Sequence, residues 1–204
     1  TILMLSLIFC FDPRPNGDGE WYRDFLEYTK QHGAKIIQRV GDLGTHGKPE
    51  LTKLVEQTIP LSDYVIFPSK WAKEKSGFGT SNFSIINNGP LEIFHSFKEQ
   101  KNIKESINIV THHWSTNPSE EEAGANHVLE AMACGLPVIY HKNGGSILDY
   151  CEDFGASYDS EVEMLKSIKY ICDNYSLYKS KVMCYNNTII NVIDQYVEVI
   201  CGLK

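Results

Sequence analysis

Two glutamates frame the segment of this sequence that is best suited to chemistry. Glu122 and Glu130 are separated by seven residues, and the small residues at 123–125 lie between them, just before a stretch predicted to be helical. Small residues let a ligand approach the backbone. A helix that begins behind them offers unpaired N–H groups and the positive end of its dipole. The sequence therefore predicts an anion site, suited to a diphosphate, at the start of this helix.

The two carboxylates extend this site toward sugars. Glu122 precedes the helix and can accept hydrogen bonds from sugar hydroxyls, whereas Glu130 can bind a vicinal diol such as a ribose, because one carboxylate accepts two hydroxyl protons. Gly144 and Gly145 follow the carboxyl end of the next predicted strand, the edge at which open α/β sheets bind ligands. Without further information, a solvated amphipathic helix with two surface glutamates is the alternative.

Two adjacent histidines are further candidates. His112 and His113 stand at the end of a predicted strand, just before Trp114. They can line the same cleft, or one of them can be an ordinary hydrogen-bonded histidine of the core. The sequence leaves both interpretations open.

Composition excludes several classes of protein. The 204 residues have a net charge of −7, which argues against a nucleic-acid partner. Six widely spaced cysteines without a CxxC pair argue against a zinc site and are typical of small core residues in a reducing compartment. We therefore expect a cytoplasmic protein without a zinc site.

The apolar run at 1–11 is too short for a membrane helix and lacks the basic start and cleavage site of a signal peptide. We predict that it is a buried strand. We expect a soluble chain that is at most peripheral to a membrane.

Strands and helices alternate along the whole chain. Strands are predicted at 1–11, 34–40, 63–68, 83–87, 107–112, 137–140 and 155–158, with helices between them and two helical stretches over 161–200. The apolar positions from Tyr170 to Val199 have helical spacing and are expected in the core. The alternation predicts an α/β, Rossmann-like fold with a mainly parallel sheet flanked by helices. A polar, lysine-rich linker or surface loop at 95–106 separates two halves, 1–95 and 105–204.

The segment EAGANHVLEAMACGLPV, residues 122–138, followed by Gly144 and Gly145, resembles the donor-site motif of retaining GT-B glycosyltransferases of family 4. That motif is Glu, seven residues, Glu-Ala-Met-Ala-Cys-Gly-x-Pro-Val and then a Gly-Gly loop. Three other stretches resemble the family in the same order: SDYVIFPS at 62–69, IINNG at 85–89 and VTHHWS at 110–115. The second of these resembles the crossing between the two domains of the family.

The resemblance implies a role for each motif residue. Glu122 would contact the sugar near the reacting carbon, Glu130 would bind the ribose, and Gly144 and Gly145 would border the donor pocket. The diphosphate would face the backbone N–H groups of Gly124, Ala125, Asn126 and His127. Residues 1–95 would be an incomplete acceptor half and residues 105–204 an incomplete donor half. The donor would be a UDP-, GDP- or ADP-sugar, and the acceptor a glycan or a lipid-linked sugar. The family generally works without a catalytic metal, so no metal or other cofactor would be needed.

The sequence also departs from the family. Only STNPSEE lies between Trp114 and Glu122, where the family has further strand–helix units that include a basic Arg and Lys pair for the leaving diphosphate. The opening strands of the acceptor domain are likewise not found, and the acidic residue of the Gly-Gly loop is shifted to Asp149. Stabilisation of developing charge is usually the largest catalytic term. Nucleotide binding is therefore a firmer expectation than turnover.

Three functions stay open at this point. The first is a hexosyltransferase, and the second is a shortened GT-B protein that binds nucleotide or a partner without catalysis. The third, a GT-B-like sugar epimerase, would need additional carboxylates that the sequence does not place. A shortened sheet exposes an edge that can pair with a second copy, so a homodimer is a further hypothesis.

Overall fold

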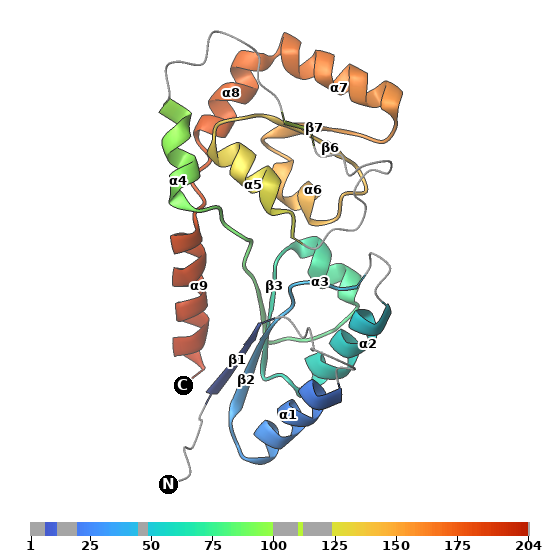
Figure 1. Cartoon of the computed structure of the whole chain (residues 1–204), viewed down its shortest axis with the longest axis vertical. Coiled ribbons are helices and arrows are strands. Elements are labelled where there is room, and N and C mark those ends of the chain that lie inside the picture. The colour runs from blue at the N-terminus through green and yellow to red at the C-terminus, as the bar shows by residue number, and fades with distance from the viewer. Residues whose placement is uncertain (1–6, 12–19, 45–48, 100–109, 112–123, 204) are drawn as a thin grey trace. The chain divides into compact units, whose positions relative to one another are not determined.

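The computed structural model describes residues 7–11, 20–44, 49–99, 110–111 and 124–203 (Figure 1). They form two compact units. The first contains the described residues up to Ile86 together with the end of the chain from Tyr196, and the second contains those from Asn87 to Gln195.

The described part of the first unit is a parallel sheet with its strands in chain order. The strands are β1 (Leu7–Phe11), β2 (Lys35–Arg39), β3 (Tyr64–Phe67) and β4 (Phe83–Ile85). They are joined through α1 (Glu20–Gln31), α2 (Pro49–Thr58) with the 3₁₀ turn η1 (Ile59–Leu61), and α3 (Lys70–Ser76). Right-handed crossovers between successive parallel strands put these helices on one side of the sheet, as Figure 1 shows.

Local signals in the sequence fix the ends of these helices. Ser69 begins α3, where its Oγ accepts a hydrogen bond from the backbone N–H of Ala72 at 2.9 Å. Gly33, with φ of 76°, ends α1 in the left-handed conformation that glycine adopts easily. The predicted boundaries near both residues are confirmed.

The last helix, α9 (Ile189–Gly202), returns the chain to the first unit. Arg39 Nε donates a hydrogen bond to the Tyr196 hydroxyl at 2.9 Å. The ring of Phe9 packs edge-to-face against Tyr196 at 5.6 Å. These contacts attach the end of the chain to β1 and β2.

The described part of the second unit contains a second parallel sheet in the order β5 (Val110–Thr111), β6 (Val138–His141) and β7 (Gly155–Tyr158). The other elements are α4 (Glu92–His95), the 3₁₀ turn η2 (Ser96–Glu99), α5 (Asn126–Ala133), α6 (Ser146–Cys151), α7 (Glu161–Asp173) and α8 (Tyr175–Met183). All four residues of β6 are buried. The prediction of an α/β fold with parallel strands flanked by helices is confirmed.

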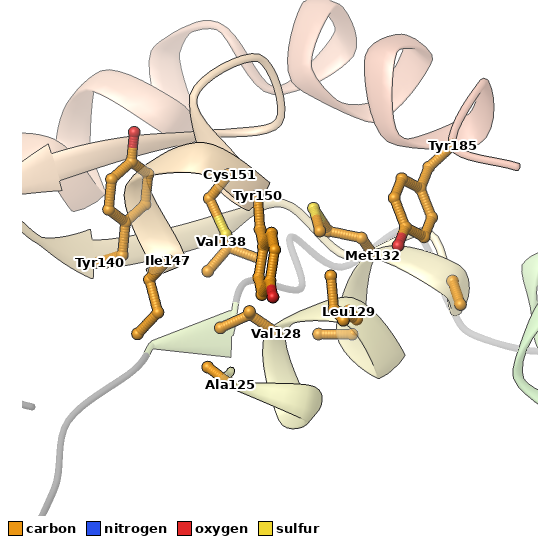
Figure 2. Close-up of a cluster of buried hydrophobic side chains, with 12 residues drawn as sticks. Ala125, Val128, Leu129, Met132, Val138, Tyr140, Ile147, Tyr150, Cys151 and Tyr185 are labelled. Carbon is orange, nitrogen blue, oxygen red and sulfur yellow. The ribbon is translucent and has the colours of Figure 1, made fainter. Parts of the chain in front are cut away.

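Helices cover both faces of β6. Val138 and Tyr140 pack with residues of α5 and α6 in one apolar cluster (Figure 2). Ile139, which points the other way along the strand, packs with Ile171 of α7 and Tyr178 of α8.

The turn from α5 into β6 is a Schellman motif. The N–H of Gly135 bonds to the carbonyl of Met132, and the N–H of Leu136 bonds to that of Ala131. Gly135 has φ of 78°, and Lys179 Nζ donates to its carbonyl oxygen at 2.7 Å. A glycine is therefore required at the position where the sequence motif has one.

The C-terminal part differs from its prediction in two respects. Residues 161–202 form three helices, because the chain breaks at Asn174 and again after Met183. The expectation that the apolar positions are core is right for Ile171, Val182 and Val192. It is wrong for Ile190, Ile193 and Val197, which are 46–50% exposed, because α9 has apolar residues around most of its surface and buries only part of it.

The predicted linker is also partly ordered. Residues 96–99 form the turn η2, and Lys98 Nζ donates to the carbonyl oxygen of Met183 at 3.3 Å, with another contact to that of Tyr185. No helix among the described residues has the length and apolar character needed to cross a bilayer.

Gly155 gives a test of the sheet. A Cβ at this position would lie 2.0 Å from the carbonyl oxygen of Val138, its partner in β6. Gly155→Ala should lower the free energy of unfolding by more than about 2 kcal/mol, because two buried strands would have to separate. Urea unfolding measures this. Gly79→Ala, which meets open space, should change it by no more than about 0.5 kcal/mol. Equal effects would show that the backbone contact does not limit the packing.

Candidate functional site

The start of α5 is anchored in the core of the second unit. Ala125 is fully buried and precedes the first helical residue with extended backbone angles (φ −76°, ψ 103°). No side chain caps the helix at this position. Asn126 and His127 follow it and are exposed. The first turn of α5 therefore has N–H groups without a partner inside the helix, next to exposed surface.

Gly124 is in contact with a side chain from another part of the chain. A Cβ at Gly124 would lie 2.8 Å from Nδ2 of Asn88. The same Nδ2 atom donates a hydrogen bond to Oδ1 of Asn126 at 3.0 Å. In the sequence, Asn88 belongs to the segment IINNG, which resembles the crossing between the two domains of the family. Its spacing from the glutamate motif gives no signal that it reaches the start of α5.

Glu130 lies one turn further along α5 and is half-buried. Burial and, secondarily, the Glu130 carboxylate raise the pKa of the Cys134 thiol. The carboxylate is thus close enough to interact electrostatically with the thiol at the end of α5. A raised pKa favours the thiol over the thiolate, which is the nucleophilic form.

The Gly-Gly loop is a tight turn after β6. The N–H of Gly144 bonds to the carbonyl oxygen of His141 at 3.0 Å. Gly145, with φ of 67° and ψ of −124°, has the angles of the first central residue of a type II′ turn, which the N–H of Ile147 closes onto the Gly144 carbonyl at 3.4 Å. A Cβ at Gly144 would lie 3.0 Å from the His141 carbonyl oxygen. Gly145 is needed for its backbone angles, and a side chain at Gly144 would be tightly packed against the strand.

His141 stabilises this turn. It is buried, its Nδ1 accepts a hydrogen bond from the N–H of Asn143 at 3.1 Å, and its ring packs edge-to-face on Tyr158 at 5.4 Å. The backbone that leads into the glycines is therefore held by a side chain of β6 itself.

One apolar cluster connects the two loops. Ala125 at the start of α5 and Ile147 in the first turn of α6 belong to the same buried group, which Figure 2 shows with Val138 of β6. Helices between parallel strands run opposite to the strands, so both helix starts lie at the carboxyl edge of the sheet. The structure therefore places Gly124, Ala125, Asn126, His127, Gly144 and Gly145 at this one edge.

A lysine that the sequence analysis did not single out lies beside the Gly-Gly loop. Lys142 Nζ is 3.0 Å from Oε2 of Glu163 and 3.2 Å from Oδ2 of Asp159. Hydrogen bonds to Glu163 and Asp159 raise the pKa of Lys142. Its positive charge is matched by two carboxylates, so this edge has little net positive potential from Lys142.

Three predicted site residues, Glu122, His112 and His113, lie outside the described residues. Their roles stay predictions. Within the described ranges, no three His, Cys, Asp or Glu side chains come together as a possible metal site. The six cysteines, all of which are described, are free thiols.

Solved structures share this fold. The Anabaena protein Alr3699/HepE in complex with UDP superimposes with a TM-score of 0.69 and 13% identity, over 97% of this chain and 79% of that one. Sucrose-phosphate synthase from Thermosynechococcus elongatus gives 0.65 and 12%, over 97% and 73%. The lipopolysaccharide outer core galactosyltransferase WaaB gives 0.64 and 11%, over 98% and 76%. No protein-family model matches the sequence, and no curated protein sequence matches it.

These neighbours are GT-B glycosyltransferases, and the chain has their α/β fold of parallel sheets flanked by helices. HepE has been solved with UDP, with UDP-glucose and with UDP and glucose. The sequence resemblance and the tertiary structure therefore indicate the same fold.

Gly145 gives a test of the loop. Its backbone angles are closed to other residues, so Gly145→Ala should cost about 1–3 kcal/mol of stability. Gly77→Asn is the control, because φ of 70° and ψ of 0° lie in the left-handed region that asparagine tolerates. Urea unfolding of both variants measures the difference. A Gly145→Ala variant as stable as Gly77→Asn would contradict the turn geometry described above.

Proposed function

We propose that this protein is a glycosyltransferase that moves a hexose from a nucleoside diphosphate sugar to a glycan or lipid-linked acceptor. The observation that supports this most directly is the coincidence of the Glu122–Glu130 motif with a fold shared with UDP-sugar enzymes. Retention at the anomeric carbon and membership of family 4 belong to the same proposal. They rest on the sequence resemblance alone.

The roles of the residues follow from their chemistry. The residues from Gly124 to His127, which lead into α5 and begin it, would bind the diphosphate through backbone N–H groups. Glu130 would accept both ribose hydroxyls, and Glu122 would act on the sugar at the reacting carbon. Residues 105–204 would form the donor half and residues 1–95 the acceptor half. UDP is the first nucleotide to test, because HepE binds it, with GDP and ADP as the alternatives.

The proposed donor is consistent with a cytoplasmic protein, which belongs to the same proposal. The protein would work without a metal. Association with a membrane surface or with a second copy would be additional and is not needed for the chemistry proposed.

A second candidate is a nucleotide-binding protein without turnover. Lys142, the described cation beside the Gly-Gly loop, already pairs with two carboxylates. The sequence between Trp114 and Glu122 has no basic pair for the leaving diphosphate. Weak stabilisation of that charge would allow binding while slowing transfer.

Glu130 tests the binding half of the proposal. Glu130→Gln should weaken UDP binding about tenfold or more, since a hydrogen bond to a charged group contributes about 1.5–3 kcal/mol. Calorimetry measures the dissociation constant, with Glu161→Gln on α7 as a surface control. The 2′,3′-dideoxy form of UDP should bind the wild type and Glu130→Gln alike. If Glu130→Gln loses affinity equally for both nucleotides, Glu130 does not bind the ribose.

Glu122 tests the catalytic half. Glu122→Ala should abolish transfer or hydrolysis of the sugar nucleotide while UDP still binds, because the residue is assigned to the sugar and not to the nucleotide. Release of UDP from UDP-glucose, GDP-mannose and ADP-glucose is the measurement. A wild-type chain that binds nucleotide but releases none supports the second candidate. A chain that binds no nucleotide at millimolar concentration refutes both.

A further inference from the structure

Asn88 stands where the chain enters the second unit, and its backbone is fixed there by the segment that precedes α9. The Asn88 carbonyl oxygen accepts a hydrogen bond from Asn187 Nδ2 at 2.8 Å. The N–H of Ile189 donates to the carbonyl oxygen of Pro90, also at 2.8 Å. A Cβ at Gly89 would lie 2.5 Å from the carbonyl oxygen of Thr188, so the backbones of segments 88–90 and 187–189 are in direct contact.

The segment at 187–189 is itself held from a second direction. The ring Nε2 of His95 lies 2.8 Å from the Asn187 carbonyl oxygen, and the His95 ring stacks on Tyr185 with an interplanar angle of 8°. Asn88 therefore projects from a backbone with fixed contacts within the second unit.

From this backbone the Asn88 amide reaches the start of α5. Nδ2 donates to Asn126 Oδ1 at 3.0 Å and occupies the space in which a side chain at Gly124 would lie. Asn88 thus touches both Gly124 and Asn126, which flank the buried Ala125. These are residues of the uncapped turn assigned to the diphosphate.

We propose that Asn88 is a positioning residue for the nucleotide-sugar donor. From its anchored backbone, the Asn88 side chain holds Gly124 and Asn126 so that the N–H groups of the first turn of α5 are aimed at the diphosphate before it binds. The inference rests on the proposed function and adds a residue to it from outside the glutamate motif. Holding a loop in its bound geometry removes an ordering cost from binding, so the effect falls mainly on donor affinity.

Two substitutions at Asn88 separate a positioning role from a structural one. Asn88→Ala removes the hydrogen bond and the contact with Gly124, and we expect UDP to bind about tenfold more weakly. Asn88→Asp keeps the size, and Asn126 can turn its amide to donate to the new carboxylate. A negative charge beside the diphosphate should nevertheless weaken UDP binding further, and more strongly at low salt than at high salt.

The measurements are calorimetry with UDP at two salt concentrations and thermal unfolding without ligand. Asn174→Ala, which removes an exposed amide that donates to the Tyr170 carbonyl oxygen at 2.8 Å, is the matched control and should bind UDP normally. A structural role alone would lower the melting temperature of both Asn88 variants while leaving UDP affinity and its salt dependence equal to those of the control.

Gly124 supplies an independent test through the same contact. Gly124→Ala would put a methyl group 2.8 Å from Asn88 Nδ2 and should weaken UDP binding by displacing the turn. In the double variant with Asn88→Ala the space is free, so the loss should be smaller than the sum of the two single losses. Additive losses would overturn the inference.

UDP binding by the wild type distinguishes the positioning role of Asn88 from the proposed function. If the wild type binds UDP and the Asn88 variants bind it equally well, only the positioning role is refuted. If the wild type binds none of UDP, GDP and ADP, the proposed function and this inference are refuted together.

Discussion

The complete burial of β6 is the constraint on which the second unit depends. Four consecutive buried residues cannot leave a backbone polar group unpaired, so β6 needs a parallel strand on each side and helices on both faces. Tyr140 and Val138 pack on α5 and α6, while Ile139 packs on α7 and α8. The two connections of β6 follow from this packing, and the second of them belongs to the candidate site. The Schellman turn at Gly135 feeds the strand, and the turn at Gly144 and Gly145 leaves it.

Four glycines of the second unit are constrained for different physical reasons. Gly135 and Gly145 have positive φ, which other residues adopt only with strain. Gly155 has none, yet its Cβ would meet the backbone of β6. Gly124 belongs to a third kind, because its missing side chain leaves space for the amide of Asn88. A motif that appears as a run of small residues thus contains separate demands of conformation, strand spacing and side-chain contact.

Among the described residues, the lysine beside the Gly-Gly loop adds little net charge to the carboxyl edge. The described lysine beside the Gly-Gly loop, Lys142, is balanced by Glu163 and Asp159, and exposed pairs of this kind contribute little to stability. The first turn of α5 follows Ala125, whose side chain makes no cap hydrogen bond. An anion bound there would be held by oriented dipoles, which suits binding of a diphosphate more than stabilisation of the charge that develops as it leaves.

The sequence by itself determined the alternation of strands and helices, the helix ends at Ser69 and Gly33, and the buried strand between the two glycine turns. These are local properties, because capping, left-handed glycine and runs of apolar residues act within a few positions of the chain. The glutamate motif could be recognised for the same reason.

Only the tertiary structure decided which apolar residues of α9 are buried, since Ile190, Ile193 and Val197 have the same helical spacing as the buried Val192. It also decided that Asn88 meets Gly124 and Asn126, and that Lys142 pairs with Glu163 and Asp159. Asn88 and Asn126 are 38 positions apart, and Lys142 and Glu163 are 21 apart. Contacts over such separations depend on how the sheet and its connections pack, and no local pattern in the sequence encodes them.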